Sequence, residues 1–162
     1  MCKPGDFMAS VALIKIVITG QGGHGSAPHN SISPIGAACD IYKALTALPA
    51  QEVDCQESVV LTITKFQSGS RNNVIPREAV LEGTIRAFNK EVMAFLIKRI
   101  KEIVASICKA YRVQIDEENS TTHTFYPPVI NHAKEAAHIE RIACSTFGKE
   151  NFTAEGLPCF AS

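Results

Sequence analysis

Residues 20 to 29, Gly-Gln-Gly-Gly-His-Gly-Ser-Ala-Pro-His, have the residue types in this sequence that are best suited to chemistry. Glycine-rich segments let a backbone adopt positive φ and approach a ligand closely. A histidine held in such a loop can donate a hydrogen bond to a small molecule or accept one from it, and His24 is the candidate. No Gly-Lys-Ser/Thr follows, which argues against a phosphate loop. No cysteine pair lies nearby at ligand spacing, which argues against a closed zinc site.

Two further polar residues stand out, Asn73 in a turn-rich loop before Val-Ile-Pro and Arg86 in an apolar strand pattern. Taken singly, Asn73 is typical of a turn residue and Arg86 of an exposed strand residue. Taken with His24, they offer a neutral hydrogen-bonding ring, an amide and a fixed cation. That set suits a negatively charged oxygen together with a carboxylate.

The elements that must position these residues alternate in a recognisable order. Apolar alternation and β-branched runs predict strands at residues 13–19, 58–66, 79–88 and 112–115, with Gly83 at a bulge. Helical spacing predicts one helix from Ser33-Pro34 to Pro49 and a second that Asn89 caps. The order β-α-β-β-α-β predicts an α+β, ferredoxin-like fold, a four-stranded antiparallel sheet with both helices on one face.

The character of the chain changes after Asp116. Polar residues run to Thr124, and Phe-Tyr-Pro-Pro then interrupts the pattern. A third helix is predicted over residues 131–147, with Asn131 as its cap. This helix has no place in the β-α-β-β-α-β pattern, so it is predicted to open another domain.

Composition narrows the function classes. Lys plus Arg and Asp plus Glu both number 16, so the formal net charge is zero, which argues against nucleic acid or an anionic membrane as the partner. No apolar run reaches the length that spans a bilayer. The six cysteines show no pairing rhythm and are read as free thiols of a reducing compartment, which predicts a cytoplasmic protein.

Three motifs in order resemble a known family: residues 20–29, then Asn-Val-Ile-Pro at 73–76, then Gly-Thr-Ile-Arg-Ala-Phe at 83–88. Together they resemble the lid, or dimerisation, domain of the aminoacylase and carboxypeptidase family of di-zinc hydrolases, in its hippurate hydrolase and auxin-conjugate amidohydrolase branch. By this resemblance, residues 1–11 are the exit segment from a catalytic domain, residues 12–118 the lid, and residues 119–162 a linker and the first helix of the returning catalytic segment.

The resemblance implies roles for the matched positions. His24 matches the lid histidine that polarises the scissile carbonyl in the partner subunit's active site, while Asn73 and Arg86 match residues that bind the substrate's carboxylate side. His29 is expected to structure the loop. The family forms homodimers through the lid, binds two zinc or other divalent ions, and hydrolyses the amide bond of N-acyl amino acids or similar small substrates.

The family's metal ligands lie outside the lid, and no match to them occurs in this sequence. Glu117-Glu118 is read as a solvated charge run, and no serine or cysteine has a general base beside it in the sequence. The chain is therefore expected to bind no metal and to be inactive alone, as a fragment of an amidohydrolase. The alternative is a stand-alone ferredoxin-like module that self-associates or binds a small molecule without catalysis.

Overall fold

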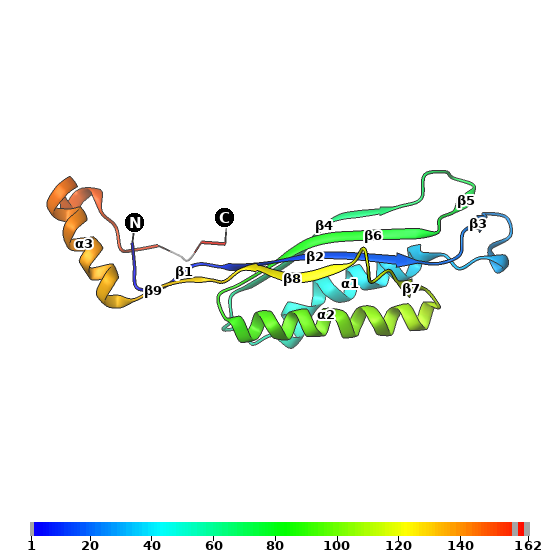
Figure 1. Cartoon of the computed structure of the whole chain (residues 1–162), viewed down its shortest axis with the longest axis horizontal. Helices are drawn as coiled ribbons and strands as arrows, with labels where there is room; N and C mark the ends of the chain where they lie inside the picture. Colours follow the sequence, from blue (N-terminus) through cyan, green and yellow to red (C-terminus); the bar gives the residue numbers. More distant parts are fainter. Residues whose placement is uncertain (1, 157–158, 161–162) are drawn as a thin grey trace.

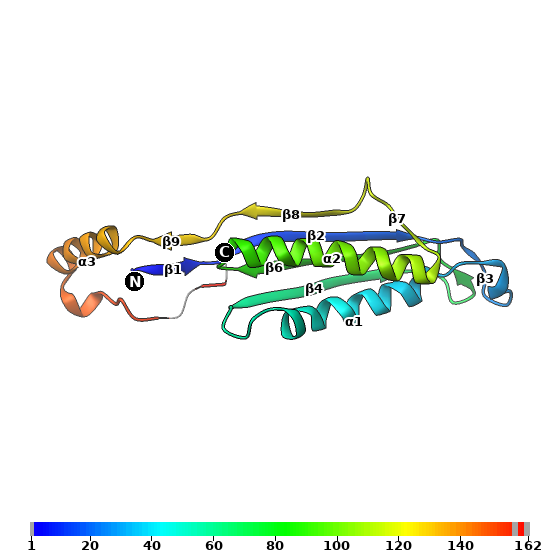
Figure 2. The ribbon, with the colours of Figure 1, turned by 90° about the horizontal axis from the view of Figure 1, so that it is seen from below.

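The computed structural model describes residues 2–156 and 159–160, and it is long and narrow (Figure 1). Its centre is a 5-stranded sheet of β4 (Val59–Ser68), β6 (Glu78–Ala87), β2 (Ser10–Thr19), β7 (Gln114–Ile115) and β8 (Thr121–Tyr126). Every neighbouring pair in this sheet is antiparallel. Helices α1 (Pro34–Glu52) and α2 (Lys90–Tyr111) cover one face (Figure 2). The predicted α+β, ferredoxin-like arrangement is therefore confirmed.

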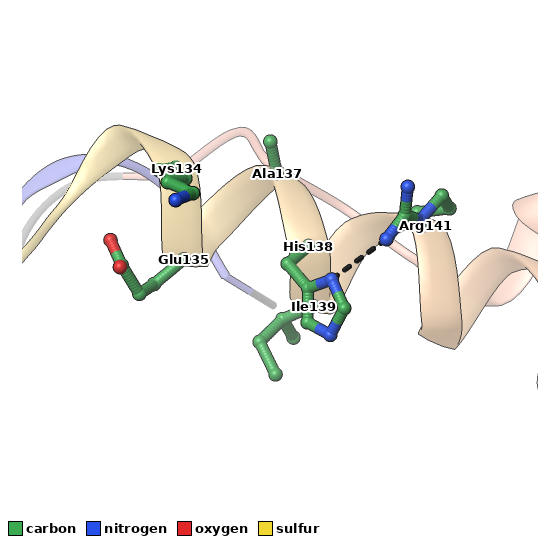
Figure 3. A pocket seen from close by; sticks show the side chains of 6 residues that line it. All are labelled: Lys134, Glu135, Ala137, His138, Ile139 and Arg141. Atoms are coloured by element: carbon green, nitrogen blue, oxygen red, sulfur yellow. Dashed lines mark hydrogen bonds between the residues drawn. The ribbon is translucent and has the colours of Figure 1, made fainter.

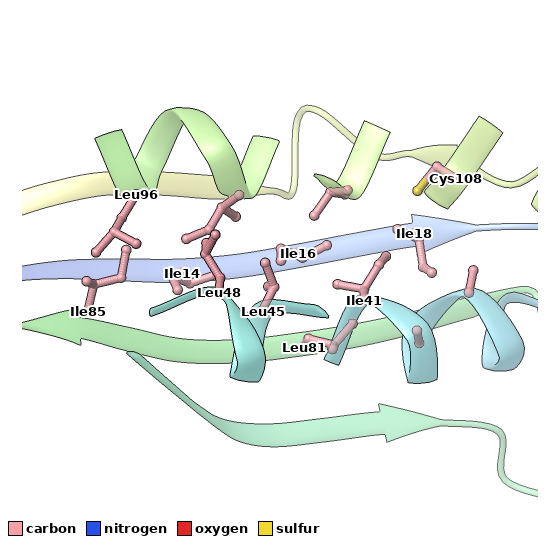
Figure 4. Close-up of a cluster of buried hydrophobic side chains, with 14 of the residues drawn as sticks. Ile14, Ile16, Ile18, Ile41, Leu45, Leu48, Leu81, Ile85, Leu96 and Cys108 are labelled. Carbon is pink, nitrogen blue, oxygen red and sulfur yellow. The ribbon is translucent and has the colours of Figure 1, made fainter. Parts of the chain in front are cut away.

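The core lies between the sheet and the two helices (Figure 4). Alternate residues of the two central strands face the helices, because side chains of a strand point to opposite faces with a period of two. The helices contribute one apolar stripe each at helical spacing. The largest of these fully buried apolar side chains are Ile18, Ile41, Leu45, Leu81, Ile85, Leu96 and Ile100.

Both helices begin where the sequence predicts. The Ser33 side chain accepts a hydrogen bond from the Ile35 amide at 3.3 Å, and Asn89 accepts one from the Glu91 amide at 2.9 Å. The predicted end of the first helix is wrong, because Pro49 lies inside α1, which continues to Glu52. A proline costs a helix most in its middle. Here only the last turn follows it, so few bonds are lost.

The fourth strand differs from the prediction. Arg112 closes α2 with a left-handed φ of 60°, so only Gln114 and Ile115 of the predicted strand pair with β2. A second strand, β8, pairs with β2 on the same side and over a longer stretch, residues 11–15. It lies in the polar segment after Asp116. The Val17 amide donates to Ser120 Oγ at 3.0 Å, which fills the gap between β7 and β8.

A β-bulge accompanies Gly83, as predicted. The register between β4 and β6 shifts between Ile63 and Lys65, opposite Gly83 and Glu82. A Cβ on Gly83 would lie 2.2 Å from the Thr62 carbonyl oxygen, a distance that no side chain tolerates. Glycine is therefore required where the two backbones approach most closely.

A narrow ribbon leads away from the sheet. It consists of β1 (Gly5–Met8) and β9 (Val129–Asn131), which pair antiparallel, and helix α3 (Ala133–Phe147) and the 3-10 turn η2 (Lys149–Asn151) follow it. The cap of α3 is His132 rather than the predicted Asn131, because Asn131 belongs to β9. No helix of the described residues combines the length and apolar character needed to cross a membrane. Cys2, Cys39, Cys55, Cys108 and Cys144 carry free thiols.

Candidate functional site

The glycine–histidine loop lies at the tip of the molecule, beyond the end of the sheet and opposite the ribbon (Figure 1). Within it, β3 (Gly23–His24) pairs antiparallel with β5 (Val74–Ile75), so that His24 faces Val74. The Gly25 amide also donates to the Asn73 carbonyl at 2.8 Å. The structure therefore brings His24 and Asn73 together, as neighbours across a two-residue ladder.

The glycines of residues 20–25 serve close backbone packing rather than unusual dihedral angles. None of them has a positive φ, contrary to the expectation from sequence. A Cβ on Gly20 would lie 2.0 Å from the Ile32 carbonyl oxygen, and a Cβ on Gly25 would lie 3.2 Å from that of Asn73. These glycines let the loop dock on its neighbours, and so they fix the position of His24.

Gly20, Gly22 and Gly25 also have the Gly-x-Gly-x-x-Gly spacing of a dinucleotide-binding loop. That motif needs a parallel βαβ unit whose helix begins at the loop. Here the described strands that neighbour β2 are all antiparallel to it, and α1 begins at Pro34 after the intervening 3-10 turn η1 (Pro28–Asn30). The structural context therefore excludes a dinucleotide site.

The polar groups at the tip are accessible. His24 is exposed, and its Nδ1 lies 2.8 Å from Ser26 Oγ and accepts a hydrogen bond from the Ser26 amide at 3.2 Å. The exposed Asn73 side chain makes no hydrogen bond to any described residue. His29, in η1, is exposed and its ring likewise has no hydrogen bond to the described part of the chain. The side chain that contacts His24 within this loop is that of Ser26, not of His29, and the sequence did not single Ser26 out.

Arg86 lies at the other end of the sheet. It is half-buried on the face opposite the helices, between Val11 of β2 and Val60 of β4, and its Nε donates to the Phe160 carbonyl at 2.7 Å. Arg86 lies eight residue steps along β6 from Glu78 at the tip end, which is roughly 26 Å at about 3.3 Å per residue. One chain therefore does not bring Arg86 together with His24 and Asn73.

The surroundings of Arg86 are mostly apolar. Tyr126 of β8 pairs with Val11 from the side opposite Arg86, and its hydroxyl is buried with no hydrogen-bond partner among the described residues. The terminal nitrogens of the Arg86 guanidinium have no partner within that part of the chain either. A guanidinium held through Nε keeps its two-pronged edge available for a carboxylate. The sequence did not indicate Tyr126, since it read that stretch as a linker.

The described residues build no metal centre. Across the described residues, no three or more histidine, cysteine, aspartate or glutamate side chains lie close enough together to hold a metal ion. Three-ligand or four-ligand sets are what zinc requires in proteins. The residues present therefore do not fit the metal centre that the resemblance implies, and we assign no catalytic step to a metal bound here.

A hollow of about 480 Å³ runs along α3, at the ribbon end of the molecule (Figure 3). Its polar lining includes His138, whose Nδ1 lies 2.8 Å from Nη2 of Arg141. All the lining residues that the structure describes come from one helix, so no second described element closes over a ligand. Ligand sites are usually concave and lined from several elements. We therefore place the candidate site at the tip and at Arg86 rather than on α3.

Comparison with known proteins agrees with this geometry. Residues 10–112 match the family model of the peptidase dimerisation domain, M20_dimer. The chain is 34% identical over 143 residues to thermostable carboxypeptidase 2 of Saccharolobus solfataricus, covering 88% of this chain and 36% of the relative. It is 32% identical over 155 residues to IAA-amino acid hydrolase ILR1-like 4 of Arabidopsis thaliana, covering 93% of this chain and 34% of the relative.

A solved structure shows the same fold within a larger enzyme. The YXEP protein of Bacillus subtilis, described as a dinuclear metal binding peptidase from the M20 family, superposes with a TM-score of 0.69 at 28% identity, over 98% of this chain and 37% of that one. The chain thus spans about a third of the length of each curated relative, at 36% and 34%, and nothing in these comparisons favours a stand-alone module. The match over residues 10–112, the two relatives and the shared fold lead to one assignment: the chain belongs to the M20 family of metal-dependent amidohydrolases and peptidases, as its dimerisation domain.

Proposed function

We propose that this chain is the lid of a cytoplasmic hydrolase that cleaves the amide bond of N-acyl amino acids or similar small substrates. His24 donates a hydrogen bond to the scissile carbonyl oxygen, Asn73 contacts the substrate beside it, and Arg86 binds the substrate's carboxylate. Amide hydrolysis develops negative charge on the carbonyl oxygen, and a donor placed there lowers the barrier by roughly 3–4 kcal/mol. The relatives named as a carboxypeptidase and an IAA-amino acid hydrolase support a substrate that ends in a carboxylate.

The separation of the tip from Arg86 is the observation that carries this proposal. Roughly 26 Å of strand between them, at about 3.3 Å per residue, is far more than a small substrate spans. A two-fold dimer resolves the mismatch, because each chain then presents its tip to the Arg86 end of the other. His24 and Asn73 of one subunit would act in trans on a substrate that Arg86 of the other subunit holds.

The outer edge of β4 is the surface we propose for that dimer. This strand is ten residues long and pairs only with β6 among the described elements. An unpaired edge is a template for another strand. Beside it, the rings of Tyr42 of α1 and Phe66 of β4 pack in a tilted arrangement at a centroid distance of 6.3 Å, with exposed fractions of 41% and 40%. Antiparallel pairing of two β4 strands brings the tip end of one chain alongside the Arg86 end of its partner.

In this proposal, the metal ions are bound by a part of the enzyme other than this chain. We place two divalent ions, zinc by resemblance to the family, on residues outside this chain, where a bound metal supplies Lewis-acid polarisation and an activated water. The lid residues orient the substrate and stabilise the charge that develops on the carbonyl oxygen. This chain alone should bind no stoichiometric zinc and hydrolyse no N-acyl amino acid. Isothermal titration with zinc that finds two tight sites per chain would contradict the proposal.

Mixing two inactive variants tests the trans arrangement. In the full-length hydrolase, His24→Ala and Arg86→Ala homodimers should each be nearly inactive. After subunit exchange, a mixed dimer holds one complete site, with Arg86 from one chain and His24 from the other. Random pairing then restores about a quarter of wild-type activity, since half of the dimers are mixed and one of their two sites is intact.

A matched control uses two residues of the same tip. His24→Ala mixed with Asn73→Ala should restore nothing, because each site receives one tip and each tip carries one defect. If the His24 and Arg86 variants fail to complement while subunit exchange is verified, the trans arrangement is wrong. If the His24 and Asn73 variants complement, these two residues do not serve the same site.

A further inference from the structure

The contact between His24 and Ser26 determines which ring nitrogen of His24 carries a proton. A backbone N–H can only donate, and the Ser26 amide donates to Nδ1 at 3.2 Å. Nδ1 must therefore carry a lone pair rather than a hydrogen in this arrangement. Ser26 Oγ, at 2.8 Å from the same atom, must then donate its own hydrogen to Nδ1. Both contacts select the tautomer that is protonated on Nε2.

We infer that Ser26 is a positioning residue, which holds the His24 ring with its Nε2–H directed away from the loop as a hydrogen-bond donor. The inference rests on the proposed function of His24 and extends it to the residue that prepares the ring. A neutral imidazole with the opposite tautomer would present a lone pair at Nε2, and a lone pair repels a carbonyl oxygen. The orientation of a histidine is commonly set by the bond that its other ring nitrogen makes.

Among the described residues, only Ser26 makes hydrogen bonds that select the tautomer of His24. Nε2 of His24 has no hydrogen-bond partner among the described residues, and no other described side chain bonds Nδ1. The ring is exposed, so neither packing nor burial fixes its orientation. The neighbouring Gly25 is tied to Asn73 through its amide at 2.8 Å, which holds the loop backbone and lets Ser26 aim its two donors.

The tautomer of His24 is tested by NMR, separately from its effect on the rate of hydrolysis. Histidine labelled with ¹⁵N in this chain reports the two ring nitrogens directly, at a pH above the ordinary histidine range of about 6.5 so that the rings are neutral. In the wild type, His24 should show a protonated Nε2 and an unprotonated Nδ1. Ser26→Ala keeps the backbone amide donor and removes the hydroxyl donor, so the two shifts should move toward each other as the second tautomer becomes partly populated. Ser26→Thr, which keeps the hydroxyl, should resemble the wild type.

Ser31→Ala is the matched control, because Ser31 lies in the same loop and its hydroxyl donates to the Pro28 carbonyl at 2.9 Å and makes no hydrogen bond to His24. It should leave the His24 shifts unchanged. In the full-length enzyme, Ser26→Ala should lower kcat about three- to tenfold, the effect of one hydrogen bond, with little change in KM. Ser26→Thr should restore most of that loss.

Three outcomes overturn the inference. The first is a wild-type His24 protonated on Nδ1. The second is a Ser26→Ala variant with unchanged ring shifts, and the third is a Ser26→Ala variant whose kcat is no lower than that of Ser31→Ala. Failure of the proposed function looks different, because His24→Ala would then leave kcat unchanged whatever the spectra show. The NMR measurement needs no turnover, so it decides the structural half of the inference independently.

Discussion

At the scale of single residues, the tip offers a ring nitrogen and an amide that the fold itself does not use. Nε2 of His24 and the side chain of Asn73 are exposed and have no hydrogen-bond partner within the described structure. Surface substitutions of this kind usually change stability by less than about 0.5 kcal/mol. Effects of these side chains on catalysis should therefore be separable from effects on folding.

Replacing His24 by alanine in the full-length enzyme should lower kcat by about a hundredfold or more, because a donor to the developing oxyanion is lost. The melting temperature should stay unchanged, since the ring stabilises nothing but its contact with Ser26. His29→Ala is the control, a histidine of the same loop with no role at the carbonyl. Steady-state kinetics with an N-acyl amino acid would measure both, and equal rates for the two variants would contradict the role of His24.

Arg86→Lys should raise KM about tenfold with a smaller change in kcat, because lysine keeps the charge and loses the planar fork that matches a carboxylate. The same variant should show no such penalty against a substrate whose carboxylate is replaced by a carboxamide. The comparison of the two substrates therefore isolates the ion pair. A KM that rises equally for both would mean that Arg86 acts through packing.

At the scale of elements, features that depend on neighbours in sequence could be predicted. The caps Ser33 and Asn89 followed from local hydrogen bonding, and the bulge at Gly83 followed from a glycine in a strand. Strand β8 could not be recognised, because an edge strand exposes its side chains and reads as polar. The residues of the site were indicated by motif, but their positions depend on a two-residue ladder and on strand register, and neither is local.

The buried thiol of α2 gives the fold a specific sensitivity to alkali. Burial raises the pKa of Cys108 from its ordinary value of 9.0 to about 11. The unfolded chain then releases the proton at lower pH than the folded one, so the stabilisation is complete below pH 9 and is lost as the pH rises from about 9 to 11.

The loss should be on the order of 1 kcal/mol by pH 10, from linkage of a single thiol. Cys108→Ala removes this linkage, so its unfolding free energy should fall less between pH 8 and pH 10 than that of the wild type. Urea titrations at the two pH values measure the difference. Cys55→Ala, which removes an exposed thiol, is the control and should keep the wild-type slope. Identical slopes for the wild type and Cys108→Ala would contradict the prediction.

At the scale of the whole molecule, we predict that the β4 edge of the sheet forms the dimer interface and that the β8 edge does not. We expect Phe66→Asp, beside the β4 edge, to shift the protein from dimer to monomer, because it places a charge in the proposed interface. Phe125→Asp makes the same change on β8, at the opposite edge, where Phe125 is 66% exposed. That variant should remain dimeric. Sedimentation velocity over a range of concentrations distinguishes the two, and a reversed result would move the interface to β8.

The tip lies at the far end of the sheet from the ribbon of β1 and β9, so a small rotation at the ribbon becomes a large displacement at the tip. From Met8 to the tip, the ten residues of β2 alone extend about 30 Å, so a rotation of one degree at the ribbon moves the tip by roughly 0.5 Å. Catalytic groups need placement to about 0.5 Å. A ribbon of only two strands is a marginal support for angular control of that order over such an arm. In the proposed function, the accuracy with which His24 meets a carbonyl would therefore depend on a second anchor near the tip, and in the proposed dimer that anchor is the neighbouring subunit.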